Sequence, residues 1–269
     1  MALDLAFESV GVGPPLVVLH GLFGSGSNWR SIARGLATTH TVYSVDLRNH
    51  GASPWADAMG YPEMADDVRG FVERQGLKQP AILGHSMGGK TAMALALMYP
   101  EHVGSLVVVD IAPVQYADTM TPFAEAMRAP DVLAAASRTE AQRRLQPLLP
   151  DPTVAPFLMQ NLVMQNDHFV WRINLGAITP AIGSLSDFPS LLQDLRFKRP
   201  MTAIVGERSD YVTGRDGLAY APMFSCVRLD VIADAGHWVH ADQPEAFVDA
   251  VQRALASKAV ETVAGVSQQ

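Results

Sequence analysis

The chain has 269 residues, of which 48% are hydrophobic and 17% charged, and its formal net charge is −7. This composition excludes a disordered chain and argues against a nucleic-acid-binding surface, which needs clustered Lys and Arg. A single cysteine, Cys226, excludes an intramolecular disulfide and a cysteine-rich metal site, and its apolar neighbours predict a small buried residue. No signal peptide is expected, and no apolar run approaches the roughly twenty residues of a membrane span, so a cytoplasmic protein is expected.

Short apolar runs alternate with segments of helical spacing along most of the chain. Residues 4–9 are expected to form an antiparallel edge strand, and Trp29–Leu36 and Met64–Gln75 have the spacing of helices. The other strand candidates are Leu16–Leu19, Thr41–Val45, Ala81–Leu83, Ser105–Val109, Met201–Val205 and Val227–Ile232. Strand–helix alternation of this kind predicts an α/β protein with a mostly parallel sheet covered by helices on both faces.

The alternation is interrupted between residues 113 and 189. No strand is expected there, and the spacing of apolar residues predicts several amphipathic helices, the last over Val154–Gln165. The stretch is too long for a loop. We interpret 113–189 as a helical cap inserted into a core domain made of 1–112 and 190–269. The alternative is a set of helices that pack away from the site and do not influence substrate choice.

The stretch around Ser86 carries the clearest chemical signal. Gly84-His85-Ser86-Met87-Gly88 follows the buried run Ala81–Leu83 and precedes the helix-forming run Thr91–Met98. A G-x-S-x-G pattern between a strand and a helix predicts a nucleophile elbow, in which the serine occupies a strained corner above the sheet. The flanking glycines are needed because a Cβ there would collide with the tightly folded backbone. Ser86 is therefore the predicted nucleophile.

A serine hydroxyl needs a neighbouring histidine that accepts its proton. In the expected fold this base follows the last strand, and His237 in Ala235-Gly236-His237 meets that condition. His240 is the late rival, but it lacks the preceding glycine turn and is interpreted as a surface or helix-start residue. His237 is therefore the predicted base.

An oxyanion hole needs two backbone N–H donors, one of them directly after the nucleophile. Met87 supplies the first, and Leu22, in the loop after Leu16–Leu19, is expected to supply the second. His20, just before Gly21, is interpreted as a buried histidine that holds this loop by hydrogen bonds. Phe23 and Trp238 are candidate substrate-binding residues of an apolar acyl pocket.

The acid that orients the histidine has two candidates. Asp110 ends the run Ser105–Val109, although an aspartate in that place could also cap the next helix. Asp210 follows the run Met201–Val205, one place later than the usual G-x-x-D spacing. The residues favour Asp110 and leave Asp210 open, with Ser209 as an auxiliary hydrogen-bond partner.

The run Asp46–Ser53 contains Asp, Arg and His, which could suggest a second catalytic site, but we favour a structural role for it. Asp46 and Arg48 are expected to brace the floor beneath the oxyanion loop, and His50 is not expected to be catalytic. No histidine or carboxylate cluster has the spacing of a metal site, and no glycine-rich loop matches a phosphate or dinucleotide fingerprint. We expect neither a metal nor an organic cofactor.

Taken together, these motifs resemble an α/β-hydrolase-fold serine hydrolase, and in particular the small bacterial esterases of the YbfF type. The matching runs lie between about residues 16 and 245 and are His20–Gly24, Asp46–Ser53, Gly84–Lys90, Val109–Pro113, Trp171–Leu175 and Ala235–Trp238. The resemblance implies hydrolysis of small-molecule carboxylic esters through an acyl-serine, without a metal or cofactor. In that family the acid follows the strand before the cap and a serine after the next strand joins it, which are Asp110 and Ser209 here.

The resemblance does not extend to the details of the cap, so acyl-chain preference is not carried over beyond a short- to medium-chain expectation. A thioesterase, a lactonase, a carbon–carbon bond hydrolase and a perhydrolase all use the same triad and remain alternatives. A ligand-binding receptor with vestigial turnover is the alternative from a different class. The sequence predicts no oligomeric state.

Overall fold

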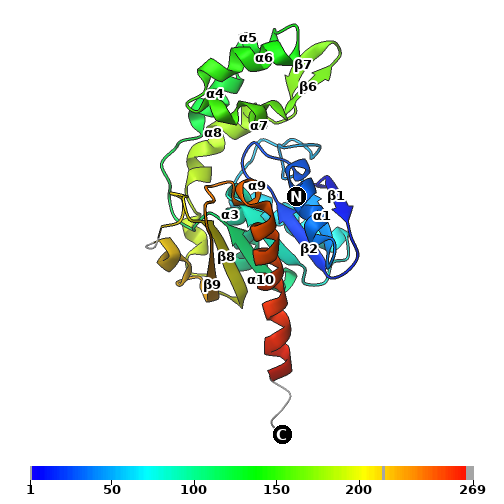
Figure 1. The fold of residues 1–269 in the computed structure, drawn as a ribbon, viewed down its shortest axis with the longest axis vertical. Coiled ribbons are helices and arrows are strands. Elements are labelled where there is room, and N and C mark those ends of the chain that lie inside the picture. Colours follow the sequence, from blue (N-terminus) through cyan, green and yellow to red (C-terminus); the bar gives the residue numbers. More distant parts are fainter. Residues whose placement is uncertain (1, 214–215, 265–269) are drawn as a thin grey trace.

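The computed structural model describes residues 2–213 and 216–264, and its centre is a seven-stranded sheet (Figure 1). The strand order is β1-β3-β2-β4-β5-β8-β9, with β1 antiparallel to β3 at one edge and every other pair parallel. The bounds are β1 Phe7–Val10, β2 Pro15–Leu19, β3 Thr41–Val45, β4 Ala81–His85, β5 Ser105–Val109, β8 Phe197–Gly206 and β9 Phe224–Ile232. The predicted α/β class, the parallel sheet and the antiparallel edge strand are confirmed.

Helices cover both faces of the sheet. The larger apolar cluster packs α2 (Tyr61–Arg74) and α3 (Met87–Met98) against one face, and a second cluster packs α1 (Arg30–Leu36) and α10 (Pro244–Ala264) against the other. The short helix α9 (Val239–Asp242) leads into α10. Strands β4 and β5 are buried along their whole length, which explains why they are continuous apolar runs and do not alternate with polar residues.

The segment 113–189, which we call the cap segment, leaves the sheet after β5 and returns at β8 (Figure 1). Its helices are α4 Thr121–Met127, α5 Pro130–Leu133, α6 Arg138–Leu145, α7 Ala155–Met159 and α8 Leu175–Ser186. The expectation that it contains no strand is wrong, because β6 (Leu162–Gln165) and β7 (His168–Trp171) form an antiparallel hairpin. Asn166 and Asp167 both have positive φ, at 49° and 63°, which is the geometry of a two-residue hairpin turn.

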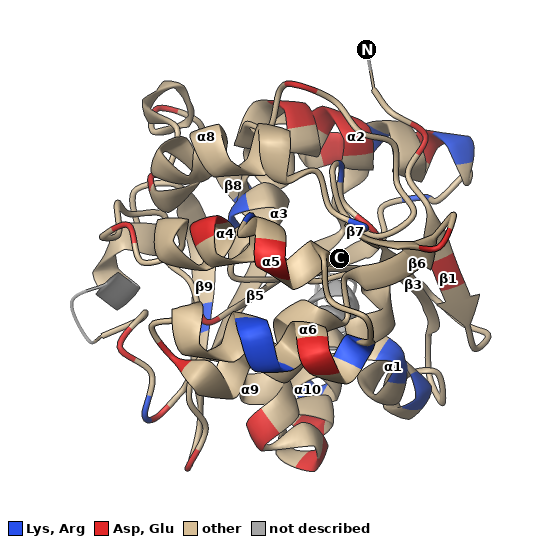
Figure 2. Ribbon diagram, turned by 90° about the horizontal axis from the view of Figure 1, so that it is seen from above, with Lys and Arg blue, Asp and Glu red and all other residues tan. Residues whose placement is uncertain are grey.

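The outer surface differs from the sequence-based expectation at one position. Cys226 is exposed, not buried, because β9 is the last strand of the sheet and, within residues 2–213 and 216–264, pairs with a strand on one side only. Acidic and basic residues are interspersed on the elements around the sheet, with acidic residues grouped on α2 (Figure 2). Within the described residues, no helix is both long and apolar enough to cross a bilayer.

Candidate active site

Ser86 lies at the turn between β4 and α3, where its backbone has φ 53° and ψ −119°. A non-glycine residue in this region is strained, and such strain concentrates at functional sites. The two glycines make the turn possible: a Cβ on Gly84 would lie 2.1 Å from the Gly88 carbonyl oxygen, and a Cβ on Gly88 would lie 2.5 Å from the Leu19 carbonyl oxygen. The strand–turn–helix context predicted for Ser86 is confirmed.

His237 lies in the loop between β9 and α9 and is paired with Asp110. The distance between His237 Nδ1 and Asp110 Oδ2 is 2.7 Å, and the carboxylate is fully buried at the end of β5. Asp110 also accepts a 3.1 Å hydrogen bond from the backbone N–H of Gly206, and the Ser209 hydroxyl donates to Asp110 Oδ2. Because the carboxylate accepts at Nδ1, this nitrogen carries the proton and Nε2 is left as the basic nitrogen.

Asp210, the other acid candidate, is exposed one residue beyond Ser209. Among the described residues it makes no hydrogen bond or ion pair, whereas Ser209 lies directly on the Asp110 carboxylate. Strands β5 and β8 are neighbours, so the end of β5 and the turn after β8 meet at one point of the sheet edge. The structure thus brings Asp110 and Ser209 to His237 and leaves Asp210 facing solvent.

The loop after β2 presents the Gly21–Leu22 peptide to the site. The Gly21 carbonyl accepts hydrogen bonds from His20 Nδ1, at 2.8 Å, and from the Gly24 N–H, at 3.0 Å. In a trans peptide the Leu22 N–H points opposite to that carbonyl. His20 Nε2 accepts from the Leu47 N–H, at 3.0 Å, which fixes the tautomer, and burial lowers the pKa of His20 to about 4. His20 therefore holds the loop as a neutral imidazole, as predicted.

Neither the Leu22 N–H nor the Met87 N–H donates a hydrogen bond within the part of the chain that the structure describes. Both residues line the same cavity as Ser86 and His237. Met87 is also the first residue of α3, where the helix dipole favours negative charge. Two backbone donors near the serine are what an oxyanion would require.

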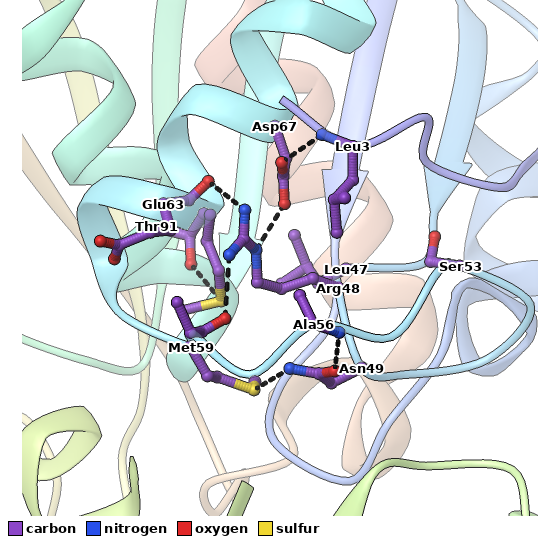
Figure 3. A network of polar contacts seen from close by, with 12 residues as sticks. Leu3, Leu47, Arg48, Asn49, Ser53, Ala56, Met59, Glu63, Asp67 and Thr91 are labelled. Carbon is purple, nitrogen blue, oxygen red and sulfur yellow. Dashed lines mark hydrogen bonds and ion pairs between the residues drawn. The ribbon is translucent and has the colours of Figure 1, made fainter. Parts of the chain in front are cut away.

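The run Asp46–Ser53 has the structural role that was predicted, with one correction. Asp46 accepts the Gly26 N–H at 2.7 Å and so braces the loop after β2, and His50 Nε2 accepts the Phe23 N–H at 3.2 Å. Arg48, however, does not lie beneath that loop. Its buried guanidinium pairs with Asp67 of α2 at 2.6 Å (Figure 3). A buried cation needs a buried anion, and α2 supplies it.

Three rings around His237 were not identified as site residues from the sequence. His85, inside the elbow motif, donates through Nε2 to the His237 carbonyl at 2.9 Å, and Tyr211 stacks on the His237 ring at 3.9 Å. His240 is at a helix start, as expected, but it is not a surface residue, because it stacks on Trp29 at 4.3 Å and lines the cavity. Burial lowers the pKa of His85 well below its ordinary value and that of His240 to about 4.

The cavity above Ser86 has a volume of about 150 Å³ and is bounded by both the core and the cap segment. Phe23 and Trp238 line it, as expected from the sequence. Cap residues contribute much of the apolar wall, and they include Tyr116, Met120, Phe123, Val154, Phe157, Leu158, Ile182 and Leu185. The alternative that these helices pack away from the site is therefore wrong.

Two buried polar side chains join the cap segment to the core. Lys90 of α3 donates to the carbonyls of Val114, Ser186 and Asp187 at 2.9–3.0 Å, and so ties both ends of the cap segment to the helix that begins after Ser86. Burial lowers the pKa of Lys90 to about 7. Asn161 of the cap segment donates through Nδ2 to the Phe23 carbonyl at 2.7 Å, which links the cap segment to the loop after β2.

Comparison with known proteins identifies the class. The sequence model of the α/β-hydrolase fold family matches residues 14–244, and the chain belongs to this family. The sn-1-specific diacylglycerol lipase ABHD11 of Xenopus tropicalis is 37% identical, over 91% of this chain and 79% of its own. Esterase YbfF of Escherichia coli is 35% identical, over 90% of this chain and 92% of its own.

A solved structure gives the same answer. The structure of a marine microorganism esterase superimposes with a TM-score of 0.90 at 37% identity and covers 94% of this chain and 99% of the other. The chain is therefore an enzyme of the α/β-hydrolase family whose relatives include esterases and lipases. Among the described residues, no group of three or more His, Cys, Asp or Glu side chains is placed to hold a metal ion.

Proposed function

We propose that the protein is a serine carboxylesterase that hydrolyses short- to medium-chain esters through an acyl-serine, with Ser86, His237 and Asp110 as its triad. The observation that carries the proposal is the 2.7 Å contact between the buried carboxylate of Asp110 and His237, which lines the same cavity as Ser86. That contact assigns the proton to Nδ1 and leaves Nε2 free to act as a base toward the serine.

In the proposed mechanism, Ser86 Oγ attacks the ester carbonyl carbon while His237 Nε2 takes its proton. The carbonyl oxygen becomes an oxyanion held by the N–H groups of Leu22 and Met87. The tetrahedral intermediate collapses, the carbon–oxygen bond to the leaving alcohol breaks, and His237 protonates that alcohol. Water, deprotonated by His237, then attacks the acyl-serine and releases the carboxylic acid and Ser86.

Asp110 has an electrostatic and orienting role in this scheme. It stabilises the imidazolium that forms on His237 in each half-reaction, and it remains ionised throughout. The Gly206 N–H and the Ser209 hydroxyl both donate to this carboxylate and hold it in position beside His237. Ser209 is therefore proposed as an auxiliary residue that fixes the acid.

The proposed substrate follows from the wall of the cavity. Phe23, Trp238 and the apolar cap residues favour an acyl chain over a charged group. The names of the relatives, esterase and diacylglycerol lipase, support an ester of an aliphatic acid. We propose that the cap segment, as a unit of its own, selects the acyl chain.

The experiment is hydrolysis of p-nitrophenyl esters from acetate to palmitate by the wild type, Ser86→Ala and a matched control, Ser184→Ala. Ser184 is an exposed serine of the cap segment. We expect a burst of one p-nitrophenolate per chain from the wild type and the control, with turnover highest for short and medium chains. Ser86→Ala is expected to lose at least about 10³-fold in kcat. Equal turnover by Ser86→Ala and the wild type would contradict the proposed nucleophile.

A further inference from the structure

The last strand of the sheet, β9, has an open outer edge. It pairs with β8 over Phe197–Gly206, and no strand among the described residues lies on its other side. Apart from that ladder, the backbone of residues 225–231 makes no hydrogen bond to another described residue. A long edge strand of this kind is a template for pairing with another chain, and proteins usually cover or interrupt it.

One face of β9 is an exposed apolar row. Val227, Leu229 and Val231 are 37%, 50% and 54% exposed. They lie opposite Met201, Ala203 and Val205 of β8, which are at most 4% exposed and belong to the main core. The row therefore lies on the same face of the sheet as the main core. That face is covered by the protein at β8 and is exposed at β9. Exposed apolar residues in a continuous row mark an interaction surface.

The other face of β9 carries charge in a particular order. Arg228 and Asp230 point to the side of α10, where Asp230 accepts from Arg253 at 3.2 Å. The strand therefore reads Val, Arg, Leu, Asp, Val from residue 227 to residue 231, with opposite charges on either side of Leu229. If a second copy of the strand runs in the opposite direction with Leu229 opposite Leu229, each arginine lies opposite an aspartate and each valine opposite a valine.

We propose that β9 pairs antiparallel with β9 of a second copy of this chain, around a two-fold axis at Leu229. In this register Leu229 faces Leu229 of the partner subunit, and Val227 faces Val231 of the partner subunit. Arg228 faces Asp230 of the partner subunit, so both cross-strand charge pairs are attractive. The two sheets join into one, and the interface is isologous, as in most soluble homodimers.

The charges also exclude the neighbouring registers. In any other register that keeps the helices of both copies on the same faces of a continuous sheet, the two-fold axis must again pass through a residue. The two nearest alternatives place the axis at Arg228 or at Asp230. The first places two arginines opposite each other and the second two aspartates, and like charges in that position are destabilising. The register centred on Leu229 is the one that satisfies the apolar row and the charges together. Since one strand pair forms the contact, we expect a reversible dimer with Kd on the order of micromolar.

The first experiment is sedimentation equilibrium over a concentration series up to about 100-fold above that Kd. The wild type is expected to reach twice the 29.0 kDa mass of one chain. Arg228→Asp and Asp230→Arg place like charges in both cross-strand pairs, so each variant alone is expected to weaken association at least about tenfold. A mixture of the two variants restores both attractive pairs and is expected to dimerise like the wild type.

Two results would overturn the proposal: a wild type that stays monomeric at the highest concentration, or a mixture that stays monomeric while the wild type dimerises. Each variant is first checked for wild-type ester hydrolysis and thermal unfolding, because neither residue contacts the cavity.

The second experiment tests the register by cross-linking in a Cys226→Ser background. Leu229→Cys brings two cysteines together at the two-fold axis, at a separation that a disulfide can span after small adjustment. Val227→Cys is the matched control, because its partner in this register is Val231 of the partner subunit. Oxidation is expected to give a covalent dimer with Leu229→Cys and not with Val227→Cys. The reverse pattern would refute the register.

Discussion

Replacing Asp110 by asparagine separates the two acid candidates, because the side chain keeps its shape and loses its charge. In the wild type, Asp110 accepts hydrogen bonds from three donors: His237 Nδ1 at 2.7 Å, the Gly206 N–H at 3.1 Å and the Ser209 hydroxyl. An asparagine offers one acceptor and one donor group in the same place. The variant therefore leaves at least one of these donors facing an NH₂ group.

The expected loss of kcat in Asp110→Asn follows from the tautomer of His237. If the amide oxygen keeps the Gly206 N–H, its NH₂ group faces His237 Nδ1, which must then accept. The proton moves to Nε2, and this nitrogen no longer serves as a base toward Ser86. In Ser-His-Asp enzymes this exchange costs about 10⁴-fold in kcat, which is about 5.5 kcal/mol of transition-state stabilisation. Asp210→Asn changes an exposed side chain that makes no hydrogen bond or ion pair with another described residue, and we expect less than about a twofold effect.

The assay is kcat and KM for p-nitrophenyl acetate, measured on the wild type and both variants above the ordinary histidine pKa. Thermal unfolding of each variant is the control, because Asp110 is buried and its replacement can also reduce stability. Similar losses for both variants, or a loss of less than tenfold for a folded Asp110→Asn, would refute the assignment of Asp110.

Three further predictions concern the loop after β2. His20→Ala removes the partner of the Gly21 carbonyl and should lower kcat by about tenfold or more with little change in KM, measured by ester hydrolysis. Burial lowers the pKa of His20 from 6.5 to about 4, so its contribution to the free energy of unfolding is complete above pH 6.5 and falls by about 3 kcal/mol as the pH decreases to 4. Other buried histidines titrate in the same direction, so this contribution is measured with urea as the difference between the wild type and His20→Ala. Asn161→Ala removes the 2.7 Å bond to the Phe23 carbonyl and should cost about 1–2 kcal/mol in stability and lower kcat.

Each of these has a result that contradicts it. A rise in KM with unchanged kcat would assign His20 to ground-state binding instead of the oxyanion loop. The same pH dependence of stability in His20→Ala and the wild type between pH 6.5 and 4 would mean that the His20 imidazole is not held neutral in the fold. Wild-type stability and kcat in Asn161→Ala would mean that the cap segment does not support the loop.

The sequence by itself determined the elements whose signals are local. The central strands β2 to β5 came out at nearly their observed bounds because buried parallel strands are continuous apolar runs, whereas β8 and β9 begin earlier than predicted and β1 begins later. Ser86 was placed at a strand–helix turn because Gly84 and Gly88 leave space where a Cβ would collide. His20 was also recognised from its local position, because a histidine between a strand end and a glycine is more often a buried residue that holds the following loop by hydrogen bonds. The hairpin turn at Asn166 was also a local signal, but it was missed in a stretch that otherwise predicts helices.

Only the tertiary structure decided which side chains meet. Asp110 and Asp210 both follow strands, and the choice between them depends on β5 and β8 being neighbours, so that Ser209 and the Gly206 N–H reach the Asp110 carboxylate. Arg48 has its partner on α2, and no pattern in its own run indicates this. The contacts of a buried charge and the order of strands in a sheet depend on residues far apart in the chain, which is why periodicity and motif spacing do not specify them.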